Sequence, residues 1–113
     1  MNILNKKSWD IEYSILNEDT KQVNISKYNW KEEILEIPSS IDWFKIWSIW
    51  MRAFANNKNI KEIYLPKDLE IIMAWAFSWT NLDKIHISKK TDIKNFYNLF
   101  WRTIPKTTII EYY

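Results

Sequence analysis

The chain contains eight tryptophans and no glycine among its 113 residues. Glycine is the usual residue wherever the backbone needs a positive φ, and a domain of this length would ordinarily contain about 8 glycines. Tryptophan stands where turn residues are expected, in Asn29-Trp30, Asp42-Trp43 and Ser78-Trp79, since Asn-Gly, Asp-Gly and Ser-Gly are frequent turn dipeptides. We therefore interpret most or all of the tryptophans as glycine positions, encoded by UGA codons that the source reads as glycine. The alternative is a genuinely tryptophan-rich protein.

Length and charge narrow the class of protein. A chain of 113 residues is one domain. The net charge of +2 is small and its 16 basic and 14 acidic residues are interspersed, so no nucleic-acid partner is expected. The absence of cysteine excludes disulfides, thiolate metal sites and cysteine catalysis. No apolar stretch reaches the about 18 residues of a membrane span, and no apolar run follows the first lysines, so we expect no signal peptide.

Short sequence units recur along the chain. The segment IKEIYLP at residues 60–66 reappears as LDKIHIS at 82–88, and ILEIP at 34–38 is an earlier copy. Between the copies, Ala53-Phe54 is followed by Ala76-Phe77. A spacing of about 22–28 residues is that of leucine-rich repeats or lies just beside it.

Each unit predicts the same local structure. A short strand directs alternating aliphatic side chains inward, namely Ile63, Leu65, Ile85 and Ile87. Proline or serine ends the strand, a second apolar pair follows, and Ala-Phe fills the core before a polar turn leads to the next strand. Strands at about 34–37, 61–65 and 83–87 should pair in parallel, with Phe54 stacked on Phe77. One unit cannot bury its apolar face alone, so neighbouring units must stack.

We expect the segments that flank the repeats to cap the two ends of the repeat array. The alternating runs IEYSIL and KQVNIS, joined by residues 17–20, predict a β-hairpin. The C-terminal TTIIEYY predicts a closing strand, and KNFYNLF at 94–100 could form a short helix.

Ile37-Pro38, Ser48-Ile49-Trp50, Ala53-Phe54 and Tyr64-Leu65-Pro66 occur in the order of one known repeat pattern. Over residues 9–88 the chain resembles the BspA-like leucine-rich repeat family, with tryptophan at that family's glycine positions. The resemblance implies an α/β repeat solenoid: a short leucine-rich-repeat array with parallel strands and an N-terminal β-hairpin cap. We expect a disordered or extended N-terminus at 1–8 and one domain at 9–113, divided into a hairpin cap (9–30), repeats (31–103) and a closing strand (104–113).

The outward strand residues form the candidate binding site. Stacked strands should align Glu36, Tyr64 and His86, with Glu111 as a fourth member, and a second row of Ile34, Glu62 and Lys84. The candidate ligand-binding residues are therefore Glu36, Tyr64, His86, Glu62 and Lys84. We expect Tyr64 and His86, the only histidine, to be solvated outside the core.

No nucleophile–base pair, metal-ligand cluster or phosphate-binding loop is recognisable. We therefore expect no enzymatic activity, no cofactor and no metal. The family resemblance implies a non-catalytic bacterial recognition protein that binds protein or glycan, acts in adhesion, and lies at the cell surface or is secreted.

A different function follows if the tryptophans are genuine. The apolar residues of segment 42–55 then have helical spacing after Asp42 as an N-cap. They are Trp43, Ile46, Trp47, Trp50, Met51 and Phe54. A tryptophan-rich amphipathic helix of this kind would lie in a membrane interface.

Overall fold

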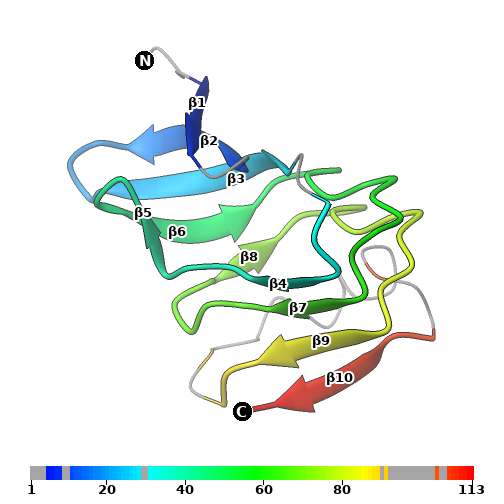
Figure 1. Cartoon of the computed structure of the whole chain (residues 1–113). Helices are drawn as coiled ribbons and strands as arrows, with labels where there is room; N and C mark the ends of the chain where they lie inside the picture. The colour runs from blue at the N-terminus through cyan, green and yellow to red at the C-terminus, as the bar shows by residue number, and fades with distance from the viewer. Residues whose placement is uncertain (1–4, 9–10, 29–30, 90, 92–103, 105–106) are drawn as a thin grey trace.

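The computed structural model describes residues 5–8, 11–28, 31–89, 91, 104 and 107–113. The strands form two sheets that enclose the core between them (Figure 1). The six-stranded sheet A has the order β1-β2-β3-β6-β5, with β8 paired to β6. The four-stranded sheet B has the order β10-β9-β7-β4.

The N-terminal part of sheet A is an antiparallel cap. Strands β2 (Ile11–Asn17) and β3 (Gln22–Tyr28) form the predicted hairpin. The Asn17 side-chain oxygen accepts hydrogen bonds from the N–H groups of Asp19 and Thr20, at 2.8 and 3.2 Å, which holds the turn. Residues 5–8, in the segment expected to be disordered or extended, form β1 (Asn5–Ser8), antiparallel to β2.

Sheet B is built from one strand of each repeat. Strands β4 (Ile34–Glu36), β7 (Glu62–Tyr64), β9 (Lys84–Ile87) and β10 (Ile109–Tyr112) pair in parallel. The first three lie within the predicted strand ranges and pair in the predicted direction, which confirms the repeat register. Strand β10 lies within the residues expected to form a closing strand, whereas the helix considered at 94–100 falls outside the described residues.

The expected α/β class is not supported, because the described residues form no helix. The segment of each repeat behind sheet B runs instead through β5 (Ser40–Ile41), β6 (Phe44–Ile49) and β8 (Ile71–Ile72). Strands β6 and β8 pair in parallel, with Ile49 beside Ile72. Isoleucine is β-branched and favours an extended backbone, which explains why these apolar pairs form strands.

The helix at 42–55 that the membrane-interface hypothesis required is likewise absent, since β6 occupies the middle of this segment. Of its aromatic residues, Phe44 and Trp47 lie within β6, where successive side chains point to opposite faces and cannot form one helical stripe. The alternative function is not supported.

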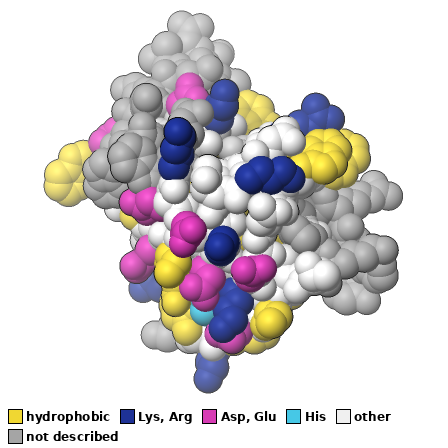
Figure 2. Space-filling model, turned by 45° about the vertical axis from the view of Figure 1, so that its right-hand side comes forward, with side chains coloured by type: hydrophobic (Ala, Val, Ile, Leu, Met, Phe, Trp, Pro, Cys, Tyr) yellow, Lys and Arg dark blue, Asp and Glu magenta, His cyan; other side chains and the backbone are white. Residues whose placement is uncertain are grey.

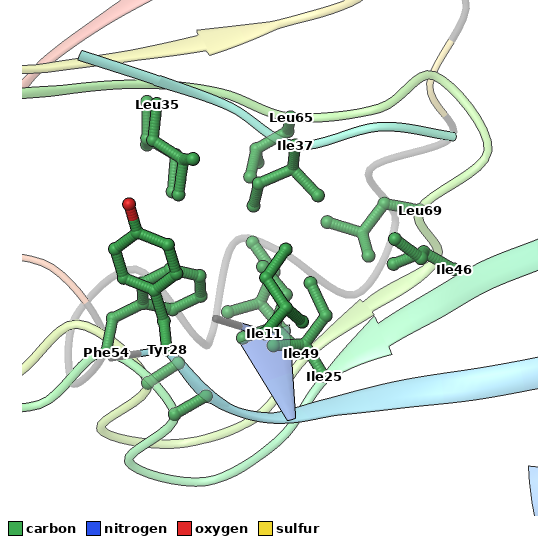
Figure 3. Close-up of a cluster of buried hydrophobic side chains, with 14 of the residues drawn as sticks. Ile11, Ile25, Tyr28, Leu35, Ile37, Ile46, Ile49, Phe54, Leu65 and Leu69 are labelled. Atoms are coloured by element: carbon green, nitrogen blue, oxygen red, sulfur yellow. The ribbon is translucent and has the colours of Figure 1, made fainter. Parts of the chain in front are cut away.

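The core is filled by aliphatic side chains from both sheets and by stacked aromatic rings (Figure 3). Ile63, Leu65, Ile85 and Ile87 all point inward, as predicted. The Phe54 and Phe77 rings stack with centroids 5.0 Å apart, and Tyr28 of the cap continues the column at 5.1 Å from Phe54. The cap therefore extends the repeat core and shields its first aromatic ring.

Three of the five described tryptophans have a positive φ: Trp43 at 72°, Trp75 at 60° and Trp79 at 56°. Trp43 and Trp79 lie in turns, as predicted, and are 95% and 62% exposed; Trp30 lies outside the described residues. Asp42 also has a positive φ, of 49°, so both residues of the two-residue β5–β6 loop are left-handed. Asp-Gly is a preferred sequence for such a loop, and tryptophan stands at its glycine position.

Candidate functional site

The outer face of sheet B carries the candidate binding residues. The strand register places Glu36, Tyr64, His86 and Glu111 side by side in one row. The neighbouring row consists of Ile34, Glu62, Lys84 and Ile109. The residues predicted for each row occur in the predicted order, and Ile109 extends the second row, because the spacing of the repeats determines which residues meet across parallel strands.

The charged groups in the middle of this face pair with one another. His86 Nε2 lies 3.4 Å from a Glu62 carboxylate oxygen, and His86 Nδ1 lies 3.6 Å from a Glu111 oxygen. The other Glu111 oxygen lies 3.3 Å from Lys84 Nζ. Figure 2 shows the histidine among acidic and basic side chains on this side of the molecule. The central residues therefore form a connected polar network.

His86 points outward as predicted, but the expectation that it is solvated is wrong, because it is only 8% exposed. Its ring stacks on Tyr64, with centroids 3.9 Å apart and planes 4° from parallel. The Tyr113 ring meets Tyr64 edge-on at 6.0 Å. Flat side chains on adjacent in-register strands cover each other, so an outward direction does not by itself expose a residue.

Tyr113 fixes the end of this aromatic group and was not among the site residues predicted from the sequence. Its hydroxyl donates a hydrogen bond to the Leu65 carbonyl at 2.6 Å, reaching past β9 to the segment after β7. Its N–H donates to the Ile87 carbonyl at 2.9 Å, and its carbonyl accepts from the Lys89 N–H at 2.7 Å. Burial, and next the nearby Glu36 carboxylate, raise the pKa of Tyr113 above its usual value. The ring is thus held in one place beside Glu36.

An open hollow of about 490 Å³ lies where the strands of sheet B end. Glu36, Ser39, Lys67, Lys89 and Tyr113 contribute to its lining, together with Ile37, Pro38, Pro66 and Ser88. Of the predicted site residues, only Glu36 borders this hollow. The signal for the two lysines was present in the sequence, since IYLPK and IHISK both end with lysine after the residue that closes the strand.

The described residues contain no group of three or more histidine and acidic side chains that could hold a metal ion. Among the same residues there is also no helix long and apolar enough to cross a membrane.

Comparisons with known proteins identify the repeat. The pattern described as the BspA type leucine rich repeat region matches residues 23–110, with 6 copies. Among solved structures, a leucine rich cell surface protein from Faecalibacterium prausnitzii A2-165 has a similar fold, with a TM-score of 0.65 and 23% sequence identity. The match covers 80% of this chain and 25% of that protein, so the chain spans about a quarter of its length. No curated protein matches the chain significantly.

Proposed function

Because the chain belongs to the BspA-type leucine-rich repeat family, we propose that it is a non-catalytic recognition module that binds a protein or glycan partner on the outer face of sheet B. The observation that carries this proposal is the parallel register that aligns Glu36, Tyr64 and His86 on one face. Stacked repeats present such a face rigidly, since each strand is fixed by its neighbours.

The chemistry of the face supports binding over catalysis. Both ring nitrogens of His86 face carboxylates, and its ring is covered by Tyr64. A general base needs access to a proton on a substrate, and this imidazole is engaged on both sides. Glu62 and Lys84 belong to the same network, so they stabilise the face and orient its exposed neighbours.

A location at the bacterial cell surface, with a role in adhesion, is part of the same proposal. It is supported by the family and by the cell surface protein that shares the fold.

We also propose that the native protein carries glycine at the tryptophan positions, encoded by UGA. The support is the positive φ of Trp43, Trp75 and Trp79, since this conformation is costly for a bulky residue and free of strain for glycine. Sequencing the gene tests the proposal: UGA codons are expected, and UGG codons at these three positions would refute it.

A charge reversal on each side of the molecule tests the recognition proposal. Glu36→Lys alters the outer face of sheet B, and Glu70→Lys alters another exposed carboxylate, beside β8 of sheet A. Both variants and the parent chain are applied to a defined array of oligosaccharides and purified surface proteins. Recognition through sheet B predicts that Glu36→Lys changes the bound set and Glu70→Lys does not. The reverse result, or no binding by the parent chain, would contradict the proposal.

A further inference from the structure

Two lysines beside the strand face differ from its other basic groups. Lys84 and His86 are engaged by Glu62 and Glu111, and Lys61 Nζ lies 3.8 Å from Glu33. Lys67 and Lys89 are exposed and have no ion-pair partner among the described residues. Both line the hollow at the ends of the strands. Two lysines that no acidic side chain among the described residues pairs with therefore line this hollow, together with the Glu36 carboxylate.

The repeats place these lysines at equivalent positions in neighbouring units. Lys67 follows Pro66 at the end of the β7 segment, and Lys89 follows Ser88 at the end of the β9 segment. Neighbouring strands are about 4.8 Å apart, and like charges at such a spacing repel. An anion bound between the two ammonium groups would relieve that repulsion and accept hydrogen bonds from both.

The other residues that line the hollow indicate which groups a ligand needs besides a negative charge. The Glu36 carboxylate borders the same hollow and can only accept hydrogen bonds when ionised. The Tyr113 hydroxyl is already committed to the Leu65 carbonyl, so its half-exposed ring offers a fixed apolar surface. A fitting ligand therefore combines an anionic group for the lysines, donors for Glu36 and an apolar face for the Tyr113 ring.

A sugar acid has these three features in one molecule. We propose that the hollow formed by Glu36, Ser39, Lys67, Lys89 and Tyr113 binds a carboxylate-bearing saccharide. The carboxylate lies between Lys67 and Lys89, ring hydroxyls donate to Glu36, and a C–H face of the sugar packs on Tyr113. This inference rests on the proposed recognition function and names its ligand class. Inorganic phosphate lacks the apolar face, and an acidic peptide presents its charges on flexible side chains that must be ordered on binding.

Titration calorimetry with galacturonic acid and trigalacturonate tests the proposal, and galactose and trigalactose serve as the matched neutral sugars. We expect the acidic sugars to bind and the neutral sugars to bind at least about tenfold more weakly, because the neutral sugars lack the hydrogen bonds between charged groups. Lys67→Ala/Lys89→Ala should weaken trigalacturonate binding by about tenfold or more. Lys31→Ala/Lys58→Ala removes two exposed lysines outside the hollow and should leave the affinity within about twofold.

Several outcomes would overturn the saccharide assignment. One is that neutral and acidic sugars bind with equal affinity, and another is that both double lysine variants lose the same affinity for trigalacturonate. A third is that hexaglutamate binds as tightly as trigalacturonate, which would indicate an acidic peptide as the ligand. Changes in amide chemical shifts distinguish a wrong assignment of the hollow from a failure of the proposed recognition function. Shifts confined to Ser39, Lys67 and Lys89 are expected; shifts confined to Glu62, Lys84 and His86 would refute the hollow and keep the strand face as the binding site. A parent chain that binds neither acidic sugars nor any other member of the array would refute both proposals.

Discussion

Arg52 and Trp75 occupy the same position in successive repeats, directly before Ala53-Phe54 and Ala76-Phe77, and each has φ of 60°. Asn56 and Trp79 are a second equivalent pair, with φ of 65° and 56°. The turn around each Ala-Phe therefore needs a left-handed backbone twice, whichever residue is present. Asparagine tolerates this conformation, whereas tryptophan is strained in it.

Replacing the exposed, strained tryptophans with glycine should stabilise the fold. Trp43→Gly and Trp79→Gly should each raise the free energy of unfolding by about 1 kcal/mol, the scale of the left-handed penalty. Trp75→Gly should raise the free energy of unfolding by less, because the Trp75 ring lies 5.5 Å from the Arg52 guanidinium and the substitution removes that contact. Urea unfolding measures the changes.

Trp47→Gly is the matched control for strain. Trp47 lies within β6, is half-buried, has no positive φ, and donates a hydrogen bond from Nε1 to the Glu70 carboxylate. Its replacement should lower stability, since glycine weakens a strand. Similar stabilisation at positions 43, 47 and 79 would show that backbone strain is not the cause.

The stacked phenylalanines should dominate the stability of the repeat core. Phe77 is fully buried against Phe54. Phe77→Ala should therefore cost about 3–5 kcal/mol in unfolding free energy. Ile109→Ala, at an exposed strand position, should change it by less than about 0.5 kcal/mol. Comparable losses in the two variants would contradict the core described here.

His86 should contribute to stability although it points outward. His86→Ala removes a ring that stacks on Tyr64 and contacts two carboxylates, so we expect a loss of about 1–3 kcal/mol. Glu36 lies in the same row but is exposed, so Glu36→Ala should change the free energy of unfolding by less than about 0.5 kcal/mol. Thermal unfolding of both variants checks this, and a His86→Ala midpoint equal to that of the parent chain would show that the stacking is not stabilising.

Tyr13 should make the fold sensitive to alkaline pH. Burial, the 2.6 Å hydrogen bond to Asp42 and the negative charge of Asp42 raise the pKa of Tyr13 from its ordinary value of 10.0 to about 12. A raised folded-state pKa gives stability that is complete below pH 10 and is lost as the pH rises towards 12. The loss should reach about 2–3 kcal/mol.

Tyr13→Phe cannot ionise and lacks this contribution. The stability difference between the parent chain and Tyr13→Phe, measured by chemical unfolding, should therefore shrink between pH 9 and pH 12. A difference that stays constant across this range would exclude Tyr13 as the sensitive group.

The sequence predicted the parallel register because its cause is local and periodic. The spacing that aligns Ile63 with Ile85 also aligns Tyr64 with His86, so the inward residues and the outward rows follow from one repeat length. The hairpin followed from alternation on both sides of a polar turn. The presence of tryptophan at expected turn positions also indicated where the backbone has a positive φ, at Trp43 and Trp79.

The errors came from contacts between distant segments. Helix was expected because the family resemblance implied it, whereas pairing of β6 with β8 kept these segments extended. His86 was expected to be solvated because strand alternation predicts which way a side chain points. It does not predict whether neighbouring side chains cover it. The hydrogen bond from Tyr113 to Leu65 joins residues 48 positions apart, and no local pattern encodes it. The hollow was missed for the same reason, although the repeated lysine after Pro66 and Ser88 was a usable signal.

The most direct test of recognition through sheet B uses single-cysteine labels, because the chain contains no cysteine of its own. Ile34→Cys carries an environment-sensitive fluorophore on the outer face of sheet B, at an exposed position that leaves the proposed ligand contacts intact, and Glu70→Cys carries the same fluorophore beside sheet A. Each labelled chain is titrated with trigalacturonate and with every array component that the parent chain binds. We expect a saturable emission change from the label at position 34 and none from the label at position 70. A change confined to the Glu70 label would contradict the assignment of the binding face.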